Sequence, residues 1–175
     1  AYSLRCTPQV LGAVRDGLRF AAEQVTVELN SATDNPLILM DELDENHAYS
    51  AGLFHGEPVG LAADHLKLVM SEMGAFSERR IYRITTGSLS ALLPPLLIKA
   101  DRPGLGLMVP QTSAAALVSE NKALCYPSSA DSIPTCEDQE DHVAMSTTAA
   151  RRADEILQLA RKVVAVEMLA AARGI

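Results

Sequence analysis

The chain has 175 residues, a formal net charge of −7, only 4% aromatic residues and no tryptophan. This length fits one domain with a sizeable core. The acidic balance, with no basic run against it, argues against a nucleic-acid partner. Alanine, leucine and valine are abundant, a mixture that suits closely packed helices better than strands. We therefore expect an all-α fold in a single domain over residues 1–175.

The cysteines and the lengths of the apolar runs indicate the cellular location of the protein. Cys6, Cys125 and Cys136 show no CxxC spacing and are odd in number, which indicates neither a zinc site nor a disulfide framework. A reducing cytoplasm is the simplest location. No apolar run approaches the roughly 18 to 20 residues that a membrane span needs, and the N-terminus shows no signal-peptide pattern. We expect no membrane partner.

The first predicted helix covers about residues 7–31. Thr7 suits its N-cap and Pro8 its first turn, and apolar residues then recur at steps of three and four. Asp34-Asn35-Pro36 should end the helix. An acidic stretch around Met40 to Asn46 is expected to be a surface excursion.

Two further helices are predicted in the middle of the chain. A glycine-rich turn, Gly52 to Gly56, leads into a second helix from Pro58 to roughly Ile84, which carries an apolar stripe. Residues 85–107 contain several prolines and should be irregular, with at most one short helical turn. A third helix is expected over about Val109 to Leu124.

The last predicted helix is the longest. It should begin near Glu140 and continue to Arg173, with Gly174 as its stop. At about 1.5 Å per residue it would be some 50 Å long. A compact domain of this size would be only about 30 Å across. Such a helix would overhang its own domain, so we expect it to pack with helices from another chain or from a segment outside this one.

Four groups of side chains could carry chemistry: Tyr2 with Arg5, Phe54 with His55, Met108 with Gln111, and the run Gln139 to His142. The planar guanidinium of Arg5 could hold a carboxylate through two parallel hydrogen bonds, although most arginines near a helix start are simply solvated. Glu140 could act as an acid or base if partly buried. The helix macrodipole, which favours acidic residues in a first turn, would explain the same spacing.

Other kinds of site find little support. His55 and Glu57 are metal-ligand types, but no third ligand stands at a suitable spacing, so we expect no metal site. The sequence contains no Gly-x-Ser-x-Gly elbow, phosphate-binding glycine loop or dinucleotide fingerprint. Nucleophilic hydrolysis and nucleotide chemistry are therefore not expected.

Eight motifs, taken in order, resemble the C-terminal part of the aromatic amino acid ammonia-lyases. They are Tyr2–Val10, Thr33–Pro36, Phe54–Pro58, Ser77–Ile81, Leu93–Pro95, Ser119–Lys122, Asp131–Thr135 and Gln139–Val143. The resemblance covers essentially the whole chain, and within the family it is closest to the histidine enzymes. It implies a bundle of long helices and a homotetramer in which each active site collects residues from three subunits.

The resemblance also implies roles for six residues. Tyr2 would lie beside an electrophilic prosthetic group, Arg5 would hold the substrate carboxylate, and Phe54 would pack at the reacting centre. The remaining three are Glu140, facing the substrate amine or side chain, Met108, lining the side-chain pocket, and Gln111, in a supporting position behind it.

The prosthetic group of the family, 4-methylidene-imidazol-5-one, forms from an Ala-Ser-Gly sequence. No serine of this chain is followed by glycine, so the group would have to form outside it. We therefore expect the chain to be a C-terminal part that is inactive alone and works with an N-terminal part of the same enzyme.

Two segments depart from the usual sequence of the family. Gly52-Leu53 replaces the usual Gly-Asn before Phe-His-Gly, and Gly104–Met108 departs from the usual Asn-Ser-Gly-Phe-Met. The leading hypothesis is elimination of ammonia from L-histidine to give urocanate. A phenylalanine or tyrosine lyase, an aminomutase, and a non-catalytic helical assembly module stay open as alternatives.

Overall fold

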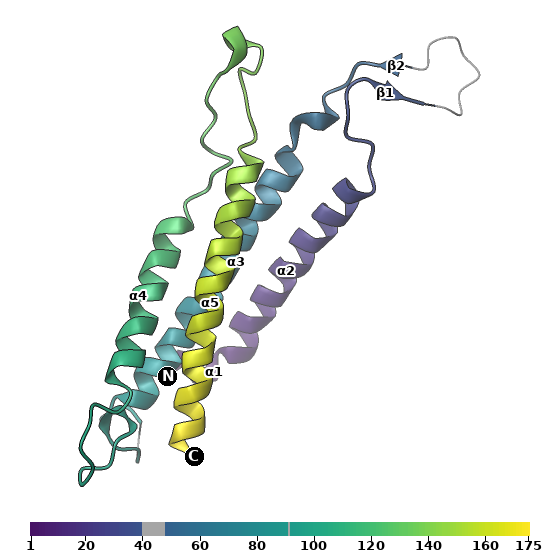
Figure 1. Cartoon of the computed structure of the whole chain (residues 1–175). Coiled ribbons are helices and arrows are strands. Elements are labelled where there is room, and N and C mark those ends of the chain that lie inside the picture. Colours follow the sequence, from purple (N-terminus) through teal and green to yellow (C-terminus); the bar gives the residue numbers. More distant parts are fainter. Residues whose placement is uncertain (40–47, 91) are drawn as a thin grey trace.

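The computed structural model describes residues 1–39, 48–90 and 92–175, and these are mostly helical (Figure 1). The helices are α1 (Tyr2–Arg5), α2 (Thr7–Leu29), α3 (Glu57–Thr85), α4 (Met108–Leu124) and α5 (Ser146–Gly174), with 3-10 turns η1 (Leu53–His55), η2 (Pro95–Leu97) and η3 (Cys136–Asp138). Strands β1 (Leu37–Ile38) and β2 (Ala48–Tyr49) form a short antiparallel pair. The all-α prediction is confirmed. The acidic stretch expected around Met40 to Asn46 lies outside the described residues.

The first three long helices lie close to where apolar periodicity predicts them. α3 and α4 each begin one residue before the predicted start, and α2 ends two residues before the predicted end. The prediction that Thr7 is an N-cap is wrong. The short helix α1 leads almost directly into α2, so Thr7 is already helical and its hydroxyl donates back to the Ser3 carbonyl at 3.3 Å.

The prediction that the last helix begins near Glu140 is also wrong, because α5 begins at Ser146. Residues 136–138 have φ values of 49°, 58° and 68°, and Met145 has 49°. A right-handed helix cannot pass through left-handed residues. The backbone forms a tight loop instead, in which the Thr135 amide donates to the Glu140 carbonyl at 3.1 Å. The acidic residues therefore lie in a loop, and the helix macrodipole does not explain them.

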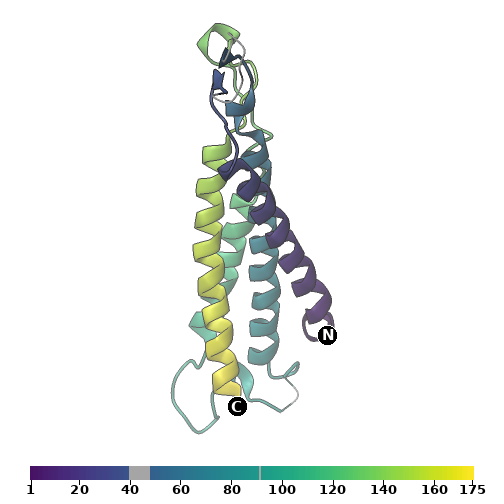
Figure 2. The same ribbon diagram turned by 90° about the vertical axis from the view of Figure 1, so that its right-hand side faces the viewer.

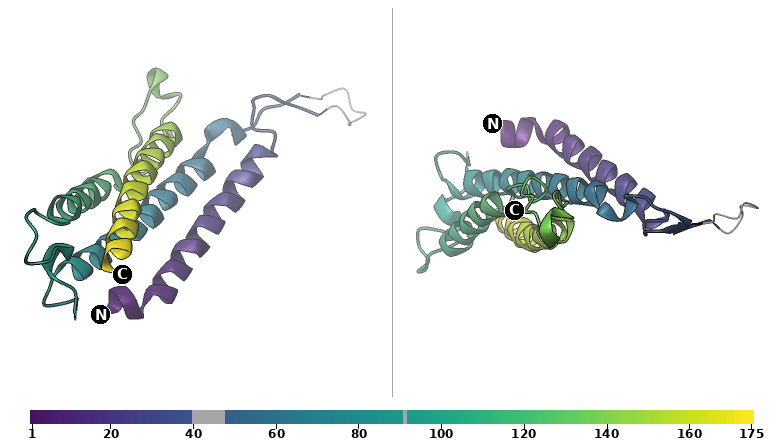
Figure 3. Two further views of the ribbon diagram at one scale, coloured as in Figure 1. Left: turned by 60° about the horizontal axis from the view of Figure 1, so that its bottom comes forward. Right: turned by 90° about the horizontal axis from the view of Figure 1, so that it is seen from above.

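The helices are arranged around α3. It lies between α2 on one side and α4 and α5 on the other, and α5 runs alongside it (Figures 1, 2 and 3). α3 and α5 have 29 residues each, which corresponds to about 43 Å. The molecule is thus elongated along these helices, and the loops at both ends extend beyond them (Figures 1 and 2). Among the described residues, no helix is both long and apolar enough to cross a membrane.

The core lies where α3, α4 and α5 meet. Its buried clusters consist of Ile81, Ala114, Val118 and Val163; of Met70, Ala153 and Ile156; and of Leu97, Leu107 and Ala170. The apolar stripe of α2 is buried only at Val14 and Ala21, and Leu29 at its end is 79% exposed. One side of α2 is therefore free of contacts from the described residues.

A buried ion pair fixes the loop after α4 to the middle of α3. Lys67 is fully buried, and its Nζ lies 2.7 Å from Asp64 Oδ1 and 2.6 Å from the Tyr126 carbonyl oxygen. Asp64 Oδ2 accepts hydrogen bonds from the Ser129 amide at 2.8 Å and the Ser129 hydroxyl at 2.6 Å. Burial acts to raise the pKa of Asp64, but the hydrogen bonds from Lys67 and Ser129 together hold it below its ordinary value.

Candidate active site

The residues singled out by sequence motifs divide between the two ends of α3. Leu4 in α1 lines one cavity together with Arg83 and Ile84, which lie in the last turn of α3. Tyr2 and Arg5, on the same short helix, are therefore at that end. Phe54 belongs to η1, which only Gly56 separates from the first residue of α3. The 29 residues of α3 place these two groups about 40 Å apart within one chain.

Met108 and Gln111 lie at the same end as Tyr2 and Arg5. Met108 is the first residue of α4. The residue before it, Leu107, packs with Ala170 near the end of α5, and Ile84 packs against the same cluster. The start of α4 is thus next to the end of α3.

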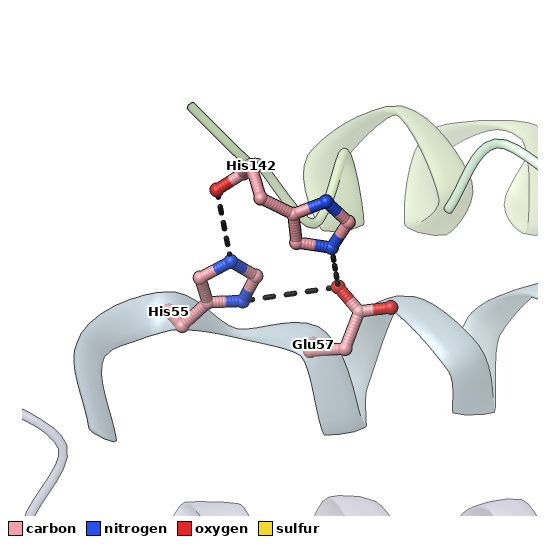
Figure 4. A group of neighbouring side chains, drawn as sticks. All are labelled: His55, Glu57 and His142. Atoms are coloured by element: carbon pink, nitrogen blue, oxygen red, sulfur yellow. Dashed lines mark hydrogen bonds and ion pairs between the residues drawn. The ribbon is translucent and has the colours of Figure 1, made fainter. Parts of the chain in front are cut away.

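Glu140 lies at the opposite end, with Phe54. The connection runs through their neighbours in the sequence, because His55 Nε2 is 3.1 Å from the His142 carbonyl oxygen (Figure 4). The loop that carries Glu140 is therefore held against the turn that carries Phe54. The fold thus brings Phe54 and Glu140 to one end, and separates them from the other four predicted residues.

Tyr2 and Arg5 present their polar groups to solvent. Tyr2 is 79% exposed, and Arg5 is also exposed in the last turn of α1. No carboxylate within the described parts of the chain forms an ion pair with Arg5. Its guanidinium donors are therefore available for a carboxylate supplied by a ligand.

The surroundings of Glu140 favour its ionised form. The neighbouring Cys136 thiol is the main cause of a lowered Glu140 pKa, and the Thr135 hydroxyl, 3.2 Å from Oε2, adds to it. Conversely, Glu140 raises the pKa of the Cys136 thiol. Glu140 is therefore an exposed carboxylate at neutral pH, and it is suited to contact a cationic amine.

Three further side chains gather beside the Phe54 and Glu140 segments. The carboxylate atom Glu57 Oε2 is 3.8 Å from His55 Nδ1 and 3.9 Å from His142 Nε2 (Figure 4). The two imidazole rings stack with centroids 5.5 Å apart. Sequence spacing offers no third partner for His55 and Glu57, whereas the fold brings in His142 from 87 residues further along the chain. These three are residues of the described chain that could hold a metal ion.

Comparison with known proteins identifies what the chain resembles. All of residues 1–175 match the model of the family described as aromatic amino acid lyase. Histidine ammonia-lyases from Rhodospirillum rubrum and Geobacillus kaustophilus are each 51% identical to the chain, over 99% and 100% of its length. The chain spans only 33% and 34% of those two proteins, about a third of their length.

Solved structures give the same fold. The histidine ammonia-lyase from Trypanosoma cruzi matches with a TM-score of 0.93 and 44% identity, over 99% of this chain and 34% of that one. The tyrosine aminomutase from Streptomyces globisporus matches with a TM-score of 0.92 and 40% identity, over 99% of this chain and 32% of that one.

Proposed function

Because the chain belongs to the aromatic amino acid lyase family, we propose that it is the C-terminal part of a histidine ammonia-lyase, which converts L-histidine to urocanate and ammonia. The observation that carries this proposal is the identity of about half of the residues with histidine ammonia-lyases over the whole length of the chain. The complete protein, rather than this chain alone, would perform the reaction.

Arg5 binds the substrate carboxylate in this proposal. A guanidinium presents two parallel N–H donors that match the two oxygens of a carboxylate. The exposure of Arg5, and its lack of an ion-pair partner among the described residues, support the role. Met108 lines the pocket for the substrate side chain, and Gln111, one turn further along α4, supports that wall.

The family generally depends on the prosthetic group 4-methylidene-imidazol-5-one. When bound, this group supplies the electron sink that removal of a weakly acidic β-proton requires. The chain contains no Ser-Gly pair, so we place the Ala-Ser-Gly precursor outside it. Tyr2 fits a neighbouring position, because its exposed phenol can donate or accept a hydrogen bond one helical turn from Arg5.

The proposed active site combines residues from more than one copy of the chain. Tyr2 and Arg5 are separated from Phe54 and Glu140 by about 40 Å, the length of α3, and one amino-acid substrate cannot span that distance. A neighbouring copy that runs in the opposite direction would bring the two groups together. Phe54 then packs at the reacting carbon, and the carboxylate of Glu140 holds the substrate amine. This separation supports an assembly of more than one copy, and we propose the homotetramer that the family resemblance implies.

An aminomutase of the same fold is the second candidate. The specific observation in its favour is the TM-score of 0.92 with a tyrosine aminomutase at 40% identity, close to the 44% of the solved histidine ammonia-lyase. The two outcomes differ in the fate of the amine, which a lyase releases and a mutase returns to the neighbouring carbon.

The test is a substrate panel with the complete protein. Incubation with L-histidine, L-phenylalanine and L-tyrosine should give ammonia and urocanate from histidine, measured by ultraviolet absorbance and an ammonia assay. Chiral chromatography would detect β-amino acids and so reveal a mutase. Ammonia release from phenylalanine or tyrosine but not from histidine would overturn the proposed substrate, and no turnover of any of the three would overturn the proposed activity.

A further inference from the structure

His55, Glu57 and His142 form a cluster with an unusual pattern of donors and acceptors. His55 ends η1, Glu57 begins α3, and His142 lies in the loop between η3 and α5 (Figure 4). One ligand atom from each side chain lies within 4.8 Å of the other two. The three ligand atoms therefore surround one small space.

The hydrogen bond of His55 determines which of its ring nitrogens is free. Nε2 lies 3.1 Å from the His142 carbonyl oxygen, which can only accept, so Nε2 carries the hydrogen and donates. In the neutral ring Nδ1 is then an unprotonated acceptor, and it faces Glu57 Oε2 at 3.8 Å. That oxygen is buried and has no hydrogen-bond donor in the described structure. Two acceptors that face each other repel unless a hydrogen-bond donor or a positive charge lies between them.

No fixed cation of the described chain fills this space. The ion-pair partners that the described residues offer Glu57 are His55 and His142 themselves, and no lysine or arginine is among them. A neutral donor, an extra proton on an imidazole, or a bound cation would each complete the arrangement, and a cation satisfies all three side chains at once. The composition of two imidazoles and one carboxylate is a frequent ligand set of zinc.

The geometry is close to that of a metal centre. Zinc bonds of about 2.0 to 2.1 Å place tetrahedral ligand atoms about 3.3 Å apart. The separations of 3.8 and 3.9 Å from Glu57 Oε2 exceed this by about half an ångström, and all three ligand atoms lie within 4.8 Å of one another. Rotation of the exposed His142 side chain can bring its Nε2 closer, and a small shift of the Glu57 carboxylate toward His55 is needed as well. Metal-bound histidines commonly donate their second ring N–H to a carbonyl or carboxylate. The bond from His55 Nε2 to the His142 carbonyl already has that form.

We propose that His55, Glu57 and His142 bind a divalent transition-metal ion with the ligand preferences of zinc. The ligand atoms would be His55 Nδ1, Glu57 Oε2 and His142 Nε2, with water completing the shell on the open side, where His142 is exposed. The ion would fasten the loop of Glu140 to the turn of Phe54. It would thus fix the relative position of two segments that sequence motifs single out. Its binding needs no substrate and does not depend on the proposed function.

Zinc binding to the complete protein tests the proposal. The protein is freed of metal with a chelator, dialysed, and titrated with zinc chloride by isothermal titration calorimetry. We expect His142→Ala to lose one equivalent of zinc per chain, or to weaken that equivalent at least about tenfold, since even second-shell changes have effects of that size. Glu57→Gln should behave in the same way. Cobalt should give the visible absorption of a low-coordinate site in the unmodified protein, and His142→Ala should lose it.

Two controls make the result specific. Cys136→Ser removes an exposed thiol from the same loop and should keep the zinc equivalent. Circular dichroism should show that the His142→Ala protein is folded, as expected for an exposed side chain. Equal stoichiometry and affinity in the unmodified, His142→Ala and Glu57→Gln proteins would overturn the proposal. So would nuclear magnetic resonance showing both nitrogens of His55 protonated in the presence of excess zinc, because protons would then fill the space.

Discussion

Glu57 and Asp64 are carboxylates on the same helix, seven residues apart, but their surroundings differ in kind. Asp64 is paired with the buried Lys67 and accepts two hydrogen bonds from Ser129. Glu57 is flanked by two imidazoles, and its buried Oε2 has no hydrogen-bond donor among the described residues. Asp64 thus has a fixed, buried counter-charge within this chain, whereas the ion-pair partners of Glu57 among the described residues are two histidines.

The difference between Asp64 and Glu57 indicates which charged groups stabilise the fold and which are available to bind a ligand. Removing one partner of a buried ion pair strongly destabilises the folded protein, because the other charge is then buried without a counter-charge. A buried acceptor without a donor is destabilising in itself, and it persists where a ligand or another chain supplies the missing contact. Stability should therefore be sensitive at Asp64 and Lys67, and activity or ligand binding at the exposed groups near the two ends of α3.

The largest effect is expected from Asp64→Asn. Neutralising this carboxylate leaves the ammonium of Lys67 buried without a counter-charge, which costs about 3 to 5 kcal/mol in comparable buried pairs. Urea denaturation followed by circular dichroism measures the change in free energy of unfolding. Lys122→Met, at an exposed position of α4, serves as the control and should change it by less than about 0.5 kcal/mol. If Asp64→Asn were as stable as the control, the buried pair would not hold the loop after α4.

The next largest effect is expected on substrate binding, from a substitution of Arg5 near the last turn of α3. In the complete protein, Arg5→Lys should raise KM for histidine about 10- to 100-fold, because a point charge replaces two parallel hydrogen bonds to the carboxylate, each charged bond being worth about 1.5 to 3 kcal/mol. Steady-state kinetics measure it, with thermal unfolding as the check on folding. The exposure of Arg5 predicts an unchanged unfolding temperature. An unchanged KM would remove Arg5 from the substrate site.

A smaller effect is expected on acidification. The pKa of Asp64 is lower in the folded protein than its ordinary value of about 3.9, so its stabilising contribution is complete above that value and is lost as pH falls through the lower, folded-state pKa. Stability should therefore fall more steeply below about pH 4 in the unmodified protein than in Asp64→Asn. Equal slopes in urea denaturation across this range would contradict the pairing.

The sequence predicts the parts of this molecule that local patterns determine. The bounds of α3 and α4 follow from apolar periodicity and from the prolines and glycines that flank them. The start of α5 lies after the predicted one because Met145, between Glu140 and Ser146, adopts a left-handed φ of 49° although it is neither a glycine nor an asparagine, the residues that would signal it. Family motifs, rather than periodicity, singled out Arg5 and Glu140.

Contacts between distant residues were beyond prediction. His55 and His142 are 87 positions apart with the α-helices α3 and α4 between them, and no spacing rule relates such positions. The same holds for Lys67 and Ser128, which meet 61 residues apart. The division of the motif residues between the two ends of α3 likewise depends on which way each helix runs. These features follow from the packing of whole helices, not from any single segment.

The smallest effect on stability is expected from Glu57→Gln, which tests the contrast between Glu57 and Asp64 directly. It makes the same isosteric change as Asp64→Asn on the same helix, but it removes a charge that lacks a fixed counter-ion. The new amide can donate to His55 Nδ1, so without metal the free energy of unfolding should change by no more than about 0.5 kcal/mol. With zinc at a hundredfold excess over its Kd, the unmodified protein should gain about 2.7 kcal/mol and the variant should gain much less. Thermal unfolding with and without zinc measures both numbers. A large loss of stability without metal would mean that Glu57 is already paired within the protein, as Asp64 is.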